Sequence, residues 1–190
     1  MGTVSGGVFN MKPSVGKFGL EMILLHWIIA AAMAVAVIYG LVSSYAETAE
    51  QTQSAMIMHQ SIGILILILA LVRVAARLRR PAPPLPTDMP RFQKGVAIAT
   101  HGLLYFTLLA FPITGYIALA ARGRAISFFG LFDLPTLLPT DLSLAARADN
   151  LHITAQWALY GLVVLHVAAA LYHQFIVKDG VLLRMWPTRK

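Results

Sequence analysis

The chain has 190 residues, of which 58% are hydrophobic and 12% charged, and its formal net charge is +7. So few charged residues could not cover the surface of a water-soluble domain, which excludes that class and favours a lipid bilayer as the partner. The absence of cysteine excludes disulfides, thiolate catalysis, iron–sulfur clusters and covalently attached haem. Because the basic residues cluster beside apolar segments, membrane topology explains the positive charge better than nucleic-acid binding does.

The first half of the chain predicts a tail and two membrane helices. Residues 1–19 are rich in Gly and Ser and are expected to form a flexible tail. The apolar stretch 20–43 predicts the first helix; a cleavable signal peptide is the alternative, but the stretch is too long and contains a histidine. The second helix is expected over 54–78, and the proline-rich segment 81–86 should end it as a polyproline II connection.

The second half predicts two further helices separated by a long loop. The third helix is expected over 95–121, with a kink at Pro112. Residues 122–149 are expected to form an apolar loop that lies on the membrane interface or caps the bundle. The fourth helix should begin near Asp149 or Asn150 and end near Val177. The expected organisation is therefore one membrane domain over 20–178, followed by a basic C-terminal tail over 179–190.

The distribution of Lys and Arg predicts the orientation. The N-terminal tail has two, residues 73–94 have six and residues 178–190 have four, whereas the other two loops have zero and three. By the positive-inside rule, both termini and the proline-rich loop face the cytoplasm. The fold class predicted is all-α: an integral membrane four-helix bundle with both termini cytoplasmic.

Six histidines lie in or at the ends of the apolar segments, and they are the candidate functional residues. An ionisable side chain in a membrane is costly and indicates function, and neutral imidazole is a common ligand of metals and haem iron. The expected orientation places His26 and His101 near the cytoplasmic face and His59 and His152 near the periplasmic face. The six are His26, His59, His101, His152, His166 and His173.

The spacing on the fourth helix predicts ligands at two depths. His152 and His166 are fourteen residues apart, nearly four whole turns, so they share a face and lie roughly 21 Å apart along the axis. His59 can complete a pair with His152 across a flat macrocycle such as haem. For the cytoplasmic pair, spacing alone does not separate His26 from His101, and His173 lies two turns beyond His166 on the same face.

Two simpler interpretations compete with haem binding. A membrane histidine can serve as a hydrogen-bonding group between helices. Zinc could also use four histidines, although it prefers a closed tetrahedral cluster and these lie at two depths. Small residues along the helices leave room for a porphyrin but serve plain helix packing equally well.

The residues together resemble a known family, the bacterial cytochrome b561 family, whose members are four-helix di-haem membrane cytochromes related to the cytochrome b subunits of hydrogenases. The resemblance covers about residues 18–186. The matching motifs are Leu25-His26-Trp27, His59-Gln60-Ser61-Ile62-Gly63, Val72-Arg73, His101-Gly102, Phe111-Pro112-Ile113-Thr114-Gly115, His166, Ala168 to Leu171, His173, Lys178-Asp179 and Leu182-Leu183-Arg184-Met185.

The resemblance implies a set of cofactors and ligands. Two haem b groups, each with two histidine ligands, would be held by His26 with His166 on the cytoplasmic side and by His59 with His152 on the periplasmic side. Ubiquinone is the implied redox partner, and His173 is a candidate quinone or proton-handling group or, equally, a hydrogen-bonding neighbour of the site. His101 is then not a ligand. Arg73 and Arg77, or on the other side Arg122, Arg124 or Arg147, could pair with haem propionates, although membrane anchoring explains the first two as well.

The predicted function is single-electron transfer in the bacterial inner membrane, between the quinone pool and a donor or acceptor on the periplasmic side, which could be an electron-transfer protein docking at the apolar loop. Some relatives are superoxide oxidases that reduce ubiquinone, which is the first alternative. Three basic against five acidic residues on the outer side argue mildly against attraction of that anion. The alternative from another class is a haem-free transporter or metal carrier.

Overall fold

Four long helices make up most of the chain in the computed structural model, which describes residues 16–186. All four are long and apolar enough to cross a membrane. Two short strands lie between the third and fourth helices, and two short helical segments follow the fourth. The elements are α1 (Leu20–Ser44), α2 (Ala49–Arg79), α3 (Arg91–Ala120), β1 (Ile126–Phe128), β2 (Phe132–Leu134), α4 (Leu142–Tyr172), a π-helix (His173–Val177) and a 3-10 helix (Leu182–Met185).

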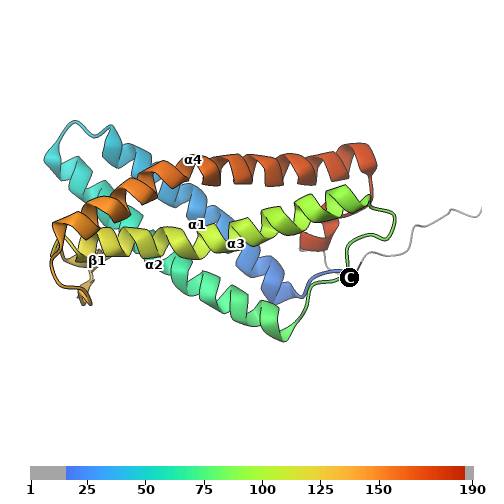
Figure 1. Cartoon of the computed structure of the whole chain (residues 1–190), viewed down its shortest axis with the longest axis horizontal. Helices are drawn as coiled ribbons and strands as arrows, with labels where there is room; N and C mark the ends of the chain where they lie inside the picture. The colour runs from blue at the N-terminus through green and yellow to red at the C-terminus, as the bar shows by residue number, and fades with distance from the viewer. Residues whose placement is uncertain (1–15, 187–190) are drawn as a thin grey trace, which may run out of the picture.

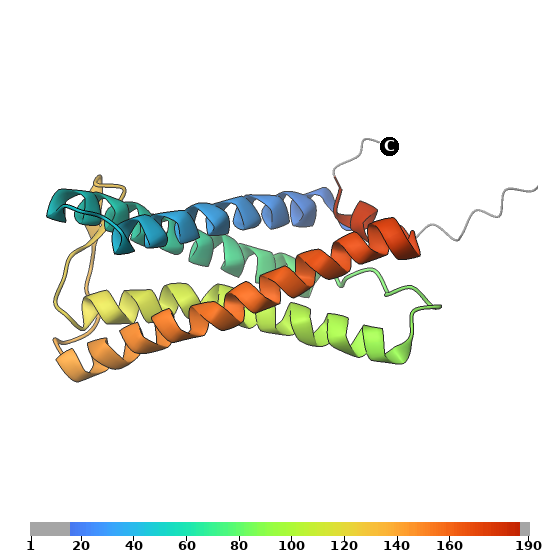
Figure 2. The same ribbon diagram turned by 90° about the horizontal axis from the view of Figure 1, so that it is seen from above.

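The four helices run side by side in alternating directions (Figures 1 and 2). α1 packs mainly against α2, α3 packs mainly against α4, and α2 joins the two pairs through α3. We call the end with the β1–β2 loop the hairpin end, and the end where α1 begins and α4 finishes the terminal end. The two described ends of the chain lie at the terminal end, as four crossings require. That this end faces the cytoplasm stays a prediction.

The apolar residues divide between a small core and a large outer surface. The core cluster lies where α1, α2 and α3 meet, and it consists of Ile29, Ala36, Ile62, Ile66, Ala70 and Leu108. Many large apolar side chains point outward instead; Ile68, Phe106 and Trp157 are 50%, 66% and 71% exposed. In water these side chains would be destabilising, whereas lipid solvates them, so the burial pattern agrees with a membrane protein.

Three helices begin earlier than the sequence predicts: α2 at Ala49, α3 at Arg91 rather than residue 95, and α4 at Leu142. α2 starts at Ala49 because Thr48 caps it, its side chain accepting a hydrogen bond from the Gln51 amide. α4 starts at Leu142 rather than near Asp149, because the Asp141 carboxylate accepts from the Leu144 amide. α3 runs unbroken through Pro112. Residues 142–149 mix polar and apolar side chains and therefore did not indicate a membrane helix, so the expected start of α4 near Asp149 was wrong.

The expected loop contains a β-hairpin that was not predicted. β1 and β2 pair antiparallel, with Ile126 opposite Leu134. Ser61 of α2, which is fully buried, accepts a hydrogen bond from the Phe129 amide, and its hydroxyl lies within hydrogen-bond distance of the Ile57 and Ser127 carbonyls, at 2.5 and 3.1 Å. Phe129 has a φ of 52°, a left-handed conformation that is uncommon outside glycine. These bonds fix the hairpin to α2 two residues from His59, and the hairpin caps the bundle, one of the two positions expected for the loop.

The described part of the C-terminal segment folds back onto the terminal end. Arg184 is only 4% exposed, and it donates to the carbonyl oxygens of Gly16, Pro83 and Pro84. Burial lowers the pKa of its guanidinium, and Asp179 opposes that effect. Arg184 thereby ties the start of the chain, the proline-rich loop and the C-terminal segment together. Most of the expected N-terminal tail, residues 1–15, and residues 187–190 lie outside the described range.

Candidate functional site

At the hairpin end, one histidine from α2 faces one from α4. The ring centres of His59 and His152 are 6.0 Å apart, and the ring planes are inclined by 81°. Each histidine lies ten residues after the first residue of its helix, and both helices begin at the hairpin end, so the two rings lie at the same depth. This is the pair that the sequence predicted for that end.

Hydrogen bonds fix the orientation of both rings at the hairpin end. His59 Nδ1 lies 2.8 Å from the Ala36 carbonyl oxygen, and His152 Nδ1 lies 3.1 Å from the Phe111 carbonyl oxygen and 3.0 Å from Thr114 Oγ1. A carbonyl oxygen only accepts, so each Nδ1 must carry the hydrogen. The lone pair of each imidazole is therefore on Nε2. This arrangement, in which the second nitrogen donates to a backbone carbonyl, is the usual support of a metal-ligating histidine.

At the terminal end, three histidines meet. His166 of α4 lies 6.1 Å from His26 of α1 and 5.4 Å from His101 of α3, measured between ring centres. The structure therefore brings His26 and His166 together as expected. It also places His101 close to His166, as the spacing argument allowed.

The separations within the pairs suit an iron atom between the rings. With metal–nitrogen bonds of about 2 Å on opposite sides of a metal, two imidazole centres lie about 6 Å apart. The His59–His152 and His26–His166 separations match that value, whereas the 5.4 Å between His101 and His166 is short for it. Among residues 16–186, no three His, Cys, Asp or Glu side chains form a group able to hold a metal ion by themselves, which disfavours a closed zinc cluster.

Glycines keep space beside the histidines. A Cβ atom on Gly40 would lie 3.2 Å from His59 Nδ1, and one on Gly115 would lie 3.5 Å from His152 Cε1. Cβ atoms on Gly63, Gly102 and Gly161 would meet nothing within 4 Å. Gly40 therefore lets α1 approach the His59 ring closely, Gly115 leaves an ordinary contact with His152, and the other three glycines face open space. The paired imidazole donors and their separations fit a haem held by one histidine on each side.

Arginines lie at both ends, but their partners differ. Arg122 forms an ion pair with Asp149 at 2.6 Å, and Arg147 donates to Ser143 Oγ at 2.7 Å. Arg73, only 7% exposed, donates to the Met22 carbonyl and to the Tyr105 hydroxyl. Arg77 has a buried Nη1 atom with no hydrogen-bond partner. The sequence did not distinguish these roles, because they depend on contacts between helices.

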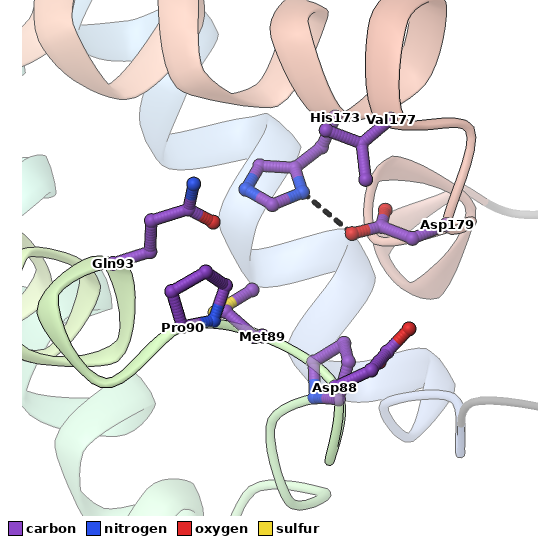
Figure 3. Close-up of a pocket in the computed structure, with 8 residues that line it drawn as sticks. Asp88, Met89, Pro90, Gln93, His173, Val177 and Asp179 are labelled. Atoms are coloured by element: carbon purple, nitrogen blue, oxygen red, sulfur yellow. Dashed lines mark hydrogen bonds and ion pairs between the residues drawn. The ribbon is translucent and has the colours of Figure 1, made fainter.

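His173 lies apart from the histidine pairs, in a small cavity at the terminal end (Figure 3). Its Nδ1 lies 2.6 Å from an Asp179 carboxylate oxygen, and both side chains are mostly buried. The cavity is about 60 Å³ and is lined by His173, Asp179, Val177, Gln93 and residues of the proline-rich loop. The sequence singled out Lys178-Asp179 as a motif but not the pairing, which a one-turn π-helix followed by a left-handed Lys178 brings about. π-helical turns of this kind are frequent at functional sites.

Comparison with known proteins identifies the family. Residues 17–188 match the family described as Prokaryotic cytochrome b561. The chain is 32% identical over 181 residues to "Cytochrome b561 homolog 1" of Escherichia coli, covering 93% of this chain and all of that protein. It is 41% identical over 129 residues to "Cytochrome b561 homolog 2" of the same species, covering 67% and 68% of the two chains. It is 31% identical over 174 residues to "Probable superoxide oxidase CybB" of Yersinia pestis, covering 92% and 98%. A chain matched over nearly its whole length in this way belongs to the prokaryotic cytochrome b561 family.

Proposed function

We propose that this protein binds two haem b groups, one at each end of the bundle, and passes single electrons between them across the bacterial inner membrane. His59 and His152 would hold the haem at the hairpin end, and His26 and His166 the haem at the terminal end. The observation that carries the proposal is that two histidine pairs at different depths have the same separation, 6.0 and 6.1 Å.

The coarser parts of this function follow from the family. Members are multi-pass bacterial membrane proteins of electron transfer, and the name cytochrome b implies b-type haem. Family membership thus favours electron transfer over a haem-free transporter or metal carrier. The number of haems, their ligands and the redox partners are proposed on the geometry.

The residues of the chain would bind, orient and enclose the cofactors. A haem with two histidine ligands supplies reversible one-electron transfer without an open coordination position. The carbonyls of Ala36 and Phe111 hold the two hairpin-end imidazoles in the tautomer that presents Nε2. Gly40 allows α1 to approach the His59 ring closely. The β-hairpin, fixed by Ser61, caps that end of the bundle and limits access of water.

At the terminal end, His26 is proposed as the partner of His166 in preference to His101. The shorter separation of His101 from His166 leaves less room for an iron between them. His26→Ala should therefore remove about one haem per chain, while His101→Ala should retain both. The reverse result would exchange the two assignments.

Ubiquinone is the proposed partner at the terminal end, near His173. Support comes from the cavity beside a histidine–carboxylate pair, since quinone reduction consumes protons as well as electrons and such a pair can pass a proton. His173→Ala should slow quinol-dependent reduction at least about tenfold, the size expected for a missing acid–base group, with haem content unchanged. Unchanged kinetics would exclude the role.

The decisive experiment on the overall function is a redox titration of purified protein with haem quantitation, with and without quinol. The expected result is a b-type spectrum at two haems per chain and reduction by quinol. A dithionite-reduced sample without a b-type band would overturn the haem proposal, and haem that quinol leaves oxidised would overturn the quinone proposal.

Superoxide is a second candidate substrate, because the relative from Yersinia pestis carries the name of a superoxide oxidase. The charges at the hairpin end argue against strong attraction of an anion there, since Asp149 neutralises Arg122. Stopped-flow mixing with superoxide tests this directly. Haem reduction faster than in a haem-free control would support the activity, and no difference would exclude it. An electron-transfer protein docking at the hairpin end is the remaining donor or acceptor.

A further inference from the structure

Arg73 and Arg77 lie one helical turn apart near the terminal end of α2, and they differ in their hydrogen bonds to the rest of the protein. Arg73 Nη1 donates to the Met22 carbonyl at 3.0 Å, and its Nε donates to the Tyr105 hydroxyl at 3.2 Å. Its guanidinium also lies 5.7 Å from the centre of the Tyr105 ring. Arg73 therefore links α1, α2 and α3, and these contacts account for its burial.

Arg77 is different, because its Nη1 is buried without a hydrogen-bond partner. Among the side chains of residues 16–186, Arg77 Nη1 is the one buried nitrogen or oxygen atom without a hydrogen-bond partner. A buried donor left unpaired costs about 1–3 kcal/mol, and more when the group is charged. Proteins rarely retain such a cost, so the position indicates an anionic partner supplied from outside the chain.

The surroundings of Arg77 show where that partner would lie. Arg77 follows Arg73 by four residues and so shares its face of α2. It interacts electrostatically with His101, whose ring lies 5.4 Å from that of His166. Two carboxylates at the terminal end, those of Glu21 and Asp179, are already engaged by Arg80 and His173. The unpaired donor therefore borders the terminal-end histidine cluster.

We propose that Arg77 is the carboxylate-binding residue of the terminal-end site, with Nη1 donating to a propionate of the haem held there. Arginine forms strong charge-assisted hydrogen bonds with carboxylates, which would repay the burial of this group. The inference rests on the proposed function, since it needs a haem at that end. Arg73 has a different role, holding three helices together.

The proposal predicts a difference between the two ends. Reduction adds one electron to a site, so a nearby positive charge favours the reduced state. At the hairpin end the charge of Arg122 is neutralised by Asp149, and Arg124 and Arg147 are exposed, so solvent screens their charges. Among residues 16–186, by contrast, no carboxylate forms an ion pair with Arg77, and its Nη1 is buried. The terminal-end haem should therefore have the higher potential. Electrons that enter at the hairpin end would then move downhill toward the terminal end.

The test is a redox titration of Arg77→Gln in the full-length haem-bound protein, with Arg79→Gln as the matched control. Arg79 lies on the same last turn of α2 and is exposed, so its charge is screened by solvent. In Arg77→Gln, the equilibrium constant for reducing one haem should fall about tenfold, which is about 59 mV for one electron. The other haem should be unchanged, and the control should leave both unchanged. The propionate vibrations of one haem should also shift in the resonance Raman spectrum.

A second variant, Arg77→Lys, tests the proposal in the case that Arg77→Gln loses one haem. If Arg77→Gln retains a single haem, Arg77→Lys should restore the second, because lysine keeps the charge; this result would also support the proposal. Two bound haems with unchanged potentials in Arg77→Gln would overturn the proposal. This is the result expected if Arg77 Nη1 binds a lipid phosphate instead of a haem propionate. Loss of both haems in both variants would also contradict it. Wild-type protein with fewer than two haems would refute the proposed function instead, whatever Arg77 does.

Discussion

At the scale of single residues, the histidine sites depend on atoms that hold the rings as much as on the rings themselves. His59 and His152 each direct Nδ1 to a backbone carbonyl of a neighbouring helix. Both acceptors are backbone carbonyls within long helices, so the helices hold them in place. An imidazole held in this way needs little reorganisation to bind a metal, which is why such neighbours commonly influence metal affinity.

Two glycines at the hairpin end should respond differently to the same substitution. Gly40→Ala would place Cβ 3.2 Å from His59 Nδ1, so the ring must move and its bond to the Ala36 carbonyl must weaken. We expect about a tenfold weaker hold on one haem, the lower end of the effect of disturbing a ligand's hydrogen bond. Gly115→Ala would make an ordinary contact at 3.5 Å and should instead stabilise α3 by up to about 1 kcal/mol.

Haem retention during dilution in detergent, followed by the b-type absorbance, measures this contrast. Thermal unfolding of the same samples gives the change in stability. Equal haem loss in the two variants would contradict the assigned role of Gly40.

At the scale of elements, the fold joins two helix pairs with a cap at one end and a clasp at the other. The cap is the β-hairpin on α2, and the clasp is Arg184 with its three carbonyl acceptors. Each device forms between segments far apart in the sequence. Both lie where helices end, and a helix end leaves backbone groups without partners inside the helix.

The hairpin should loosen when Ser61 is removed. Ser61→Ala removes a fully buried hydroxyl and leaves the Phe129 amide without its acceptor, which should cost about 1–3 kcal/mol of stability. Ser43→Ala is a suitable control because the Ser43 hydroxyl bonds only to the Gly40 carbonyl of its own helix. Hydrogen exchange at the Phe129 amide should accelerate in Ser61→Ala and stay unchanged in Ser43→Ala. Equal protection in both variants would show that Ser61 does not fix the hairpin.

At the scale of the whole molecule, the sequence was sufficient for the helices, their order and the pairing of histidines by depth. These features follow from the length of the apolar segments, the positions of Lys and Arg and the helical repeat. All three can be read from the sequence without knowing which distant segments contact each other. The family was likewise predicted from motifs and is confirmed by the match over residues 17–188. The ligand roles of the four histidines stay predictions.

Features that depend on contacts between distant segments could not be predicted. The hairpin was missed because its strands have only three residues each and are held by Ser61, sixty-six residues before Ser127. The pairing of His173 with Asp179 needs a π-helical turn that has no clear sequence signal. The difference between Arg73 and Arg77 appears only when α1 and α3 are placed around α2.

The orientation of the molecule gives a prediction at this scale. Since the chain has no cysteine, a single introduced cysteine is the only thiol. Thr136→Cys, in the exposed loop at the hairpin end, should react with a membrane-impermeant maleimide on intact spheroplasts. Thr87→Cys, exposed in the proline-rich loop, should react only after lysis. The opposite pattern would invert the predicted topology and exchange the faces assigned to the two sites.

The most direct test of the central claim is the haem content per chain in His152→Ala, His166→Ala and the double variant, purified beside the wild type. The claim is that two histidine pairs hold two independent haems. We expect two haems in the wild type, one in each single variant with the other haem's spectrum retained, and none in the double variant. Two haems in either single variant, or the loss of the same haem in both, would contradict the account.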